Sequence, residues 1–546
     1  MKPEPSNRRS WWLGVSLAIL ALVVYGNNLH GPFILDDVPW ILNNPNIRTL
    51  WPLWKPLLNT SRPVVQWSLA ANYAIGGLEP IGYHLVNNLI HALAGLALFG
   101  VVRRTLRTRR LADRFGESAD GIAFAVALLW AVHPLDTESV TYVIQRAESM
   151  AGLFAVLTLY CVIRGAMVER ATAWNSAAIL SCALAVGSKP VAAVVPFLAL
   201  AYDWIFLAGG WSELWRKRWR LYVGLGASWL LATVFLAAGK KEWMGSAGVV
   251  SGGRAIGWID YAMLQPQVIV HYLRLSLWPD NLCLLYGRPQ QSTGLLFWLF
   301  CAVIGGSLLG TAWLLARRSP RGFLGAWFFV ALAPTSSVIP LLHPMFEHRM
   351  YLPLMAVVAG IVCGMYWLLG EVVGGKSRAW VWAALVAMAG VALGATTIRR
   401  NMDYRTEVSI WQDTARKAPM NPDAQYGLAL ALATAGQIDE ASAAFAETMR
   451  LKPEFSLAEY DWGRTLEKAG REMEALEHFR AALRIDPRYA EAEDGIGVVL
   501  YHQGKLDEAI QHFFEATRLN PNDAQAQQNL AEALREQKQQ RSTNRK

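Results

Sequence analysis

Eleven apolar runs, each near the length of a membrane-spanning helix, occupy most of the first 400 residues. A helix needs about 20 mostly apolar residues to cross a bilayer. The runs are centred in 11–28, 82–102, 120–135, 149–167, 173–188, 191–208, 219–239, 294–316, 321–340, 351–370 and 379–397. Of the 546 residues, 53% are hydrophobic and only 17% are charged, which excludes an ordinary soluble protein. The sequence therefore predicts an all-α, polytopic membrane helical bundle over residues 1–400.

In two apolar stretches, length alone does not decide whether the segment crosses the membrane. The first run follows Arg8 and Arg9, as a signal peptide would, but the following "VVYGNNLHG" has no small-residue cleavage pattern, so we expect a retained span. The stretch 261–279 contains Pro266, His271 and Arg274, and we predict that it lies at the interface or dips partway into the bilayer.

Basic residues indicate the orientation of the bundle. The densest Lys and Arg clusters are 103–114, 215–220 and 316–321, and all three fall on the side of the N-terminus if the eleven spans are correct. Short loops rich in Lys and Arg stay cytoplasmic. The net charge of +9 thus reflects topology, and we predict no nucleic-acid partner. External loops are expected at 29–81, 133–148, 240–293 and 341–350.

The chain changes character after residue 400, where four ladders of residues repeat every 34 positions. They are Pro419, Pro453, Pro487 and Pro521; Gly436, Gly470 and Gly504; Ala441, Ala475 and Ala509; and Phe445, Phe479 and Phe513. This period is that of tetratricopeptide repeats (TPR), pairs of antiparallel helices that stack into a solenoid. We predict a TPR domain over 401–546, with repeats 420–453, 454–487 and 488–521, a partial repeat before them and a capping helix after them.

The concave face of such a solenoid is a candidate docking surface for a protein or peptide. The 34-residue register places Tyr426, Tyr460, Arg464, Tyr501 and His502 on the first helices, which line that face. An odd number of spans starting inside puts the TPR domain outside the cytoplasm. We therefore expect a bacterial inner-membrane protein with a cytoplasmic N-terminus and a periplasmic TPR domain.

Polar motifs at the predicted external ends of the spans suggest a catalytic site. Asp36 and Asp37 follow the first span, and Arg146, Lys189 and Arg349 lie in other external segments. Ionisable residues at span ends are costly and usually mark function. A carboxylate that deprotonates a hydroxyl and cations that stabilise an anionic leaving group fit transfer from a lipid-linked sugar phosphate. Paired Asp residues in a membrane also fit a proton relay, so the residues alone leave this choice open.

The order of the motifs identifies a family. "FILDDVPWILNNPNI", "HPLDTESVTYVIQRAESMAGLF", "SKPVAAVVPFLALAYDW" and "HPMFEHRMYLPLM", followed by TPRs, resemble the transmembrane and tetratricopeptide-repeat (TMTC) O-mannosyltransferases. The most specific segment, 62–91, includes Arg62, Pro63, Asn72, Tyr73, Gly77, Leu78, Pro80, Tyr83, His84, Leu85, Asn87 and His91. That family belongs to the glycosyltransferase C (GT-C) superfamily, whose members take sugars from polyprenyl-phosphate carriers at the extracytoplasmic face.

The resemblance implies roles for individual residues. Asp36 or Asp37 would be the catalytic base, and the second of them would orient the acceptor or assist a divalent metal. The donor phosphate and substrate would be bound by Arg62, His84, Glu138, Arg146, Lys189, Glu347, His348, Arg349 and Tyr351. "EHRMYLP" departs from the family pattern because His348 stands between Glu347 and Arg349.

The expected reaction moves mannose, or another hexose or a pentose, to a hydroxyl group, with Ser or Thr of an exported protein as the expected acceptor. The TPRs would dock that protein. Two other classes remain open: a transporter or flippase of the lipid-linked sugar, and a non-catalytic TPR scaffold of the cell envelope. Transporters often have two similar halves, and no such duplication is visible in the spans.

Overall fold

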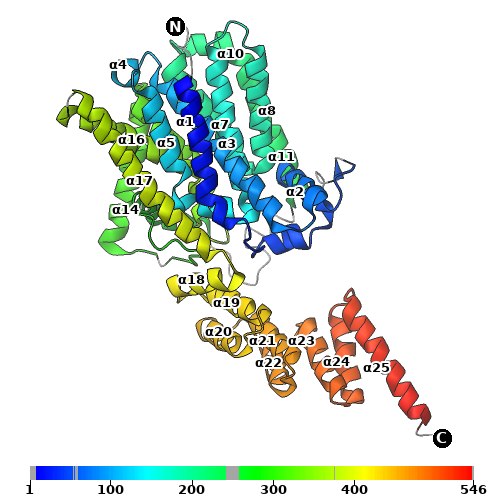
Figure 1. The fold of residues 1–546 in the computed structure, drawn as a ribbon. Helices are drawn as coiled ribbons and strands as arrows, with labels where there is room; N and C mark the ends of the chain where they lie inside the picture. Colours follow the sequence, from blue (N-terminus) through cyan, green and yellow to red (C-terminus); the bar gives the residue numbers. More distant parts are fainter. Residues whose placement is uncertain are drawn as a thin grey trace. The chain divides into compact units, whose positions relative to one another are not determined.

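The computed structural model describes residues 8–52, 54–55, 60–240, 257–289, 291–373 and 375–543, and in these ranges it contains helices and no strand. The chain divides into two compact units. Unit 1 is Met1–Leu284 with Arg288–Thr406, and unit 2 is Leu285–Gly287 with Glu407–Lys546. Figure 1 shows long helices in unit 1 and short paired helices in unit 2. The all-α prediction is confirmed for the described residues.

Unit 1 is built mainly of long apolar helices. Its α-helices are α1 Arg8–Tyr25, α2 Pro63–Gly76, α3 Pro80–Leu106, α4 Ala112–Phe115, α5 Ala119–Ala131, α6 Thr137–Thr141, α7 Arg146–Ala166, α8 Thr172–Ser188, α9 Val195–Tyr202, α10 Trp211–Gly226, α11 Ser228–Ala238, α13 Trp258–Leu277, α14 Gly294–Ala316, α15 Pro320–Leu332, α16 Pro353–Val372 and α17 Gly375–Asp403. Short helices of other types are η1 Gly26–Asn28, η2 Val38–Leu42, η3 Pro45–Ile47, η5 Pro134–Asp136, η6 Val143–Gln145, η7 Pro190–Val194, η8 Asp203–Leu207 and η9 Glu347–Met350.

Each of the eleven predicted spans corresponds to helical structure, although not all meet the length of a span. In the described residues, eight helices are long and apolar enough to cross a membrane, and a ninth arises if Ala119–Ala131 and Pro134–Thr141, which are bent by 50°, form one broken span. The runs at 173–188 and 321–340 form helices of only 17 and 13 residues, α8 and α15. Pro266 lies inside α13, which is not among the candidate spans.

Burial separates the centre of the bundle from its periphery. In the apolar windows of Pro80–Leu106 and Val143–Ala166, 67% and 72% of the residues are buried, whereas the window of Gly294–Ala316 is only 6% buried. An apolar helix that the protein does not cover is suited to contact lipid. The helices α3 and α7 therefore form the core, and the surface of α14 is suited to face the hydrocarbon.

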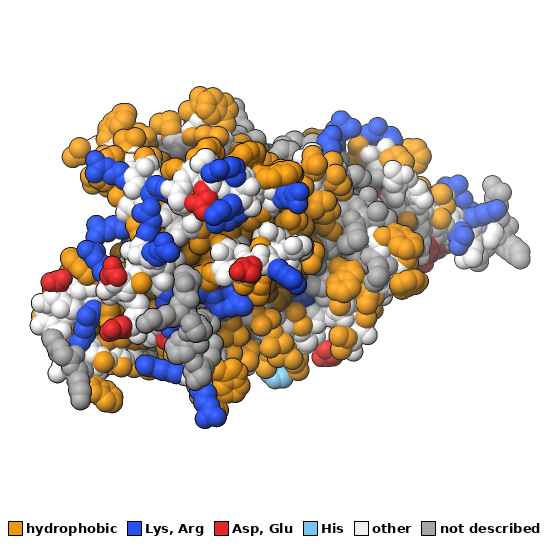
Figure 2. Space-filling view, turned by 90° about the horizontal axis from the view of Figure 1, so that it is seen from above, with side chains coloured by type: hydrophobic (Ala, Val, Ile, Leu, Met, Phe, Trp, Pro, Cys, Tyr) orange, Lys and Arg blue, Asp and Glu red, His pale blue; other side chains and the backbone are white. Residues whose placement is uncertain are grey.

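The three basic clusters meet at one end of unit 1. Arg110 donates a hydrogen bond to the carbonyl of Arg318 at 3.0 Å, and Arg318 donates to the carbonyls of Trp204 and Gly209 beside α10. In Figure 1 the N-terminus, α4 and α10 lie at this end. Figure 2 looks onto it and shows Lys and Arg side chains gathered among hydrophobic ones. We call this the basic end of unit 1.

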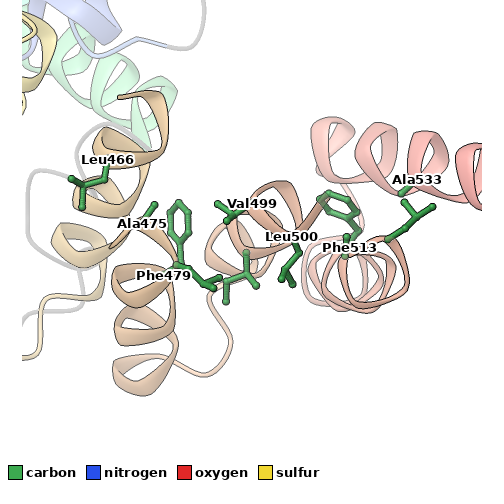
Figure 3. Close-up of a cluster of buried hydrophobic side chains, with 11 residues drawn as sticks. Leu466, Ala475, Phe479, Val499, Leu500, Phe513 and Ala533 are labelled. Carbon is green, nitrogen blue, oxygen red and sulfur yellow. The ribbon is translucent and has the colours of Figure 1, made fainter. Parts of the chain in front are cut away.

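Unit 2 consists of stacked helix pairs. After α18 Glu407–Lys417 come α19 Pro422–Thr434 with α20 Ile438–Leu451, α21 Ser456–Lys468 with α22 Glu472–Ile485, α23 Ala490–His502 with α24 Leu506–Leu519, and α25 Ala524–Thr543. Figure 3 shows how Phe479 and Phe513 fill the space between neighbouring helices. Phe479 and Ala475 are fully buried.

The backbone conformation explains why glycine repeats every 34 residues. Gly436, Gly470 and Gly504 turn the chain between the two helices of a pair with φ angles of 77°, 76° and 74°. These left-handed conformations are costly for residues with a Cβ atom. The 34-residue spacing in the sequence therefore follows from both the packing of each helix pair and the turn between its helices.

Candidate functional site

Asp37 fixes the loop that follows α1. Its side chain is fully buried, and its two oxygens accept hydrogen bonds from the backbone N–H groups of Ile34 at 3.1 Å and Ile144 at 2.7 Å. Burial raises the pKa of Asp37 to about 8, although both N–H groups favour the ionised form. Asp37 thus joins the first loop to the segment before α7, and its carboxyl group is not available to a substrate.

Asp36 has the opposite environment, because its side chain is exposed. Its backbone N–H donates to the hydroxyl of Tyr142 at 2.7 Å, which holds the turn against the second loop. Desolvation by the surrounding protein raises the pKa of Asp36, and the charges of Arg62 and His343 and a hydrogen bond from Tyr142 oppose this shift. A carboxylate with a raised pKa is a stronger base.

Two buried acid–base pairs lie in the same region. Glu138 accepts a hydrogen bond from the backbone N–H of His348 at 2.9 Å and contacts His348 Nδ1 at 2.7 Å. Lys189 pairs with Glu148, and both side chains are buried. The charges of Lys189 and Arg349 act on Glu138, and that of Glu138 acts on Asp36. The structure therefore brings side chains of several of these polar segments together.

The segment 343–351 is held mostly by its own residues. The guanidinium of Arg349 donates to the carbonyl oxygens of His343 and Pro344, each at 2.6 Å. Glu347 accepts from the backbone N–H of Cys283. The hydroxyl of Tyr351 lies 2.9 Å from His91 Nδ1, deep in the bundle. These contacts favour positioning roles for Arg349, Glu347 and Tyr351 over direct substrate contact.

Arg146 and His84 also serve the scaffold. Arg146 is fully buried and donates to Asn87 Oδ1 and Asn72 Oδ1, each at 2.6 Å, and to the carbonyl of Tyr83 at 2.9 Å. The N–H groups of Arg146 thus bond to neutral oxygen atoms of α2 and α3. A phosphate of the sugar donor would need the same N–H groups. The His84 Nε2 atom lies 3.0 Å from the carbonyl oxygen of Gly31. Both side chains are buried in these contacts, which favours positioning roles over the predicted contact with a phosphate.

Exposure selects one carboxylate from this polar cluster, which contains Asp36, Asp37, Glu138, Glu148 and Glu347. Four of the five are buried, and Asp36 alone is exposed. Arg62, at the start of α2, and His343 are half-buried and act on Asp36. The sequence indicated Arg62 but not His343 or Tyr142. Tyr142 lies inside the motif "HPLDTESVTYVIQRAESMAGLF", and His343 is the first residue of "HPMFEHRMYLPLM". Their place in these motifs was the available signal.

The described side chains do not form a recognisable metal site. Among these residues, no group of three or more His, Cys, Asp or Glu side chains is arranged to hold a metal ion. Asp37 and Glu138 already accept hydrogen bonds from backbone N–H groups. A divalent ion therefore has no ready set of protein ligands beside Asp36 in the part of the chain that the structure describes.

The predicted groove residues of unit 2 fall into two groups. Tyr426 and Tyr501 are half-buried, and their hydroxyls donate to Asp461 and Glu536 on neighbouring helices, each at 2.5 Å. Tyr460 is half-buried and packs against Tyr489, with ring centroids 5.2 Å apart.

By contrast, the side chains of Arg464 and His502 are exposed. Arg464 lies over the Tyr460 ring at 5.9 Å, and His502 Nδ1 is 3.5 Å from Glu472. The tyrosines thus connect repeats, and the two exposed side chains are the more accessible to a ligand.

Comparison with known proteins finds one repeat family and several similar proteins. A tetratricopeptide-repeat family model matches residues 408–454 and 460–524. Human protein O-mannosyl-transferase TMTC1 is 34% identical over 173 residues, which cover 28% of this chain and 18% of that protein. The Caenorhabditis elegans protein O-mannosyl-transferase F38B6.6 is 23% identical over 460 residues, which cover 80% of this chain and 62% of that protein. The chain is thus similar to the TMTC proteins over part of their length.

This similarity confirms the family resemblance predicted from the motifs. The match spans less than a fifth of human TMTC1 and under two thirds of the nematode protein. Among solved structures, the archaeal oligosaccharyltransferase AglB from Archaeoglobus fulgidus aligns with 77% of this chain and 60% of its own, at 14% identity and a TM-score of 0.41.

Proposed function

We propose that this TMTC relative is a GT-C-like membrane glycosyltransferase that moves a sugar from a polyprenyl-phosphate carrier to a hydroxyl group of an exported protein. The observation that carries the proposal is the environment of Asp36. It is the exposed carboxylate of the polar cluster, and the charges of Arg62 and His343 act on it. The names of the similar proteins, protein O-mannosyl-transferases, support mannose as the sugar and a protein as the acceptor.

The reaction needs one base and one site for negative charge. Asp36 accepts the proton of the acceptor hydroxyl as its oxygen attacks the anomeric carbon of the sugar. The bond from that carbon to the phosphate oxygen breaks, and the polyprenyl phosphate leaves with the electron pair. Arg62 stabilises the charge on the departing phosphate. We assign this role to Arg62 because the other two cations are occupied: Lys189 is paired with Glu148, and Arg349 with carbonyl oxygens.

The buried members of the cluster keep this geometry in place. Asp37 holds the loop that carries Asp36, and the pair of Glu138 and His348 joins α6 to η9. Catalytic groups need such support, since small displacements cost large factors in rate. In this proposal the site faces the periplasm of a bacterial inner membrane, with unit 2 on the same side.

Glycoproteomics can test the proposal directly. A deletion strain should lose a hexose mass from Ser or Thr residues of exported proteins, and the wild-type gene should restore it, whereas the gene with Asp36→Asn should not. Purified protein should consume a polyprenyl-phosphate sugar only when an acceptor is present. Accumulation of the intact lipid-linked sugar on one face of the membrane, with Asp36→Asn still able to restore modification, would instead favour a transporter. Unchanged glycoproteins with altered envelope complexes would favour a scaffold.

A further inference from the structure

A cavity of about 570 Å³ lies between α3, α7, α15 and α16, away from the polar cluster. On α3 its wall includes Leu98 to Leu106, whereas Asn87 of the same helix contacts Arg146 near the polar cluster. An α-helix rises 1.5 Å per residue, so Leu106 is about 28 Å from Asn87 along the axis. The part of the cavity beside Leu106 and Arg110 therefore lies at the basic end of unit 1.

The walls and the mouth of this cavity differ in chemistry. Val102, Leu324, Trp327 and Cys363 give it apolar walls. Three exposed arginines line it as well: Arg110 in the loop after α3, Arg114 in α4 and Arg321 at the start of α15. No acidic residue is among the described residues that line it. Figure 2 shows basic side chains gathered at this end with hydrophobic surface between them.

The arrangement of the arginines is built by the fold. Arg110 donates to the carbonyl of Arg318, which brings the loop after α3 to the start of α15. Arg321 lies in the first turn of α15, a turn without acidic residues. The positive end of the α15 dipole therefore adds to the charge of the three side chains.

We propose that this cavity binds an anionic phospholipid, with one acyl chain between α3, α15 and α16 and the phosphate between Arg110, Arg114 and Arg321. Basic pockets between membrane helices on the cytoplasmic side are suited to lipid phosphates, and juxtamembrane Lys and Arg are attracted to an anionic leaflet. A soluble anion would use the arginines but leave the apolar walls without a partner. This inference is independent of the proposed transferase chemistry.

Native mass spectrometry of the full-length protein in detergent tests this binding. Dioleoyl-phosphatidylglycerol should remain bound as one molecule, and dioleoyl-phosphatidylcholine should not. Replacing Arg110, Arg114 and Arg321 together with Gln should weaken phosphatidylglycerol binding about 100-fold, the scale expected for three basic groups at an anionic surface. Bound lipid should also raise the melting temperature, because it binds only the folded protein.

Two further variants separate specific binding from general attraction. Replacing Arg109, Arg216 and Arg220 with Gln removes the same charge from exposed positions that do not line the cavity, and should leave binding unchanged. Gly364→Leu keeps all arginines and should abolish binding, since a Cβ at Gly364 meets no atom within 4 Å and the new side chain can enter the cavity.

Several results would overturn the inference: equal binding of phosphatidylcholine, equal loss in the control triple variant, unchanged binding in a folded Gly364→Leu protein, or complete displacement of the lipid by inorganic phosphate.

Discussion

Asp36 and Asp37 are neighbours in the chain, yet the structure gives them separate tasks. Asp37 is buried with both oxygens bonded to backbone N–H groups, and Asp36 is exposed beside Arg62 and His343. The double Asp of the motif thus combines a carboxylate that holds a loop with a carboxylate that the loop presents.

The two residues should therefore respond differently to the same substitution. Asp36→Asn should lower transfer by about 100-fold or more, the scale of a lost general base, and leave the melting temperature unchanged. Asp37→Asn would turn an amide NH₂ toward a backbone N–H, and an unsatisfied buried donor costs about 1–3 kcal/mol. Its melting temperature should fall. Asp113→Asn, at an exposed residue of the basic end, is the matched control for both assays. Near-normal transfer by Asp36→Asn would remove Asp36 as the base.

The pH dependence of transfer reports on Asp36. Only the ionised carboxylate accepts a proton, so the rate should rise with pH through a pKa that desolvation by the surrounding protein has raised above the ordinary 3.8. The positive charge of His343 lowers this pKa. His343→Gln should consequently move the acid limb of kcat/KM to higher pH, with the plateau rate retained. An acid limb that moves to lower pH, or does not move, would contradict this arrangement of charges.

At the scale of helices, Arg146 joins three elements. Its guanidinium lies at the start of α7 and bonds to Asn72 on α2 and to Asn87 and the Tyr83 carbonyl on α3. The sequence predicts a donor-binding arginine here, because a cation at a span end normally indicates function. The partners lie 59 to 74 residues away, and no local pattern indicates that neutral oxygens would occupy its donors.

Arg146→Ala should accordingly act through stability. Removing the guanidinium leaves the oxygens of Asn72, Asn87 and Tyr83 without their donor, and each buried unsatisfied group costs about 1–3 kcal/mol. We expect a clear loss of thermal stability and a parallel loss of donor and acceptor use. Arg109→Ala, at an exposed position, is the control. A stable Arg146→Ala protein with a higher KM for the donor alone would restore the role of phosphate ligand.

The elements that the sequence predicts well are those with a repeated physical cause. The 34-residue ladders follow from identical packing in each helix pair, as the buried Phe445, Phe479 and Phe513 show. Hydropathy locates the spans because lipid requires long apolar helices. Hydropathy does not reveal that α15 ends after 13 residues or that the helix beginning at Ala119 bends by 50° before Pro134. Both features come just before a proline, Pro334 and Pro134, which hydropathy alone does not register.

For the whole molecule, the basic end makes a prediction about topology. The clusters around Arg110, Arg218 and Arg318 meet at one end of unit 1, and loops rich in Lys and Arg stay in the cytoplasm. A reporter after Lys546 should be active only outside the cytoplasm if the eleven helical runs alternate as predicted. A second reporter inserted after Arg216 should be active only inside. Cytoplasmic activity of the first reporter would contradict both the parity of the spans and a compartment shared by unit 2 and Asp36.

The role of unit 2 can be separated from the chemistry by changing the predicted groove residues Tyr460 and Arg464. Truncation at residue 420 also removes Asn421, whose side chain donates to the carbonyl of Leu285 at 3.0 Å, so a point variant is cleaner than deletion. Replacing Tyr460 and Arg464 with Ala should raise the KM for a protein acceptor more than it lowers kcat, because binding common to the ground and transition states is lost.

Transfer from the same donor to a small surrogate acceptor should be unaffected in that variant. Arg480→Ala changes an exposed arginine on α22, the second helix of the same pair, and should leave both reactions unchanged. If the Tyr460 and Arg464 variant modified its protein acceptor as efficiently as the wild type, the repeats would have to act in assembly or localisation. A parallel loss with the small surrogate would instead mean that unit 2 supports the fold of the enzyme, since a docking surface has no contact to offer an acceptor that carries only the reacting hydroxyl.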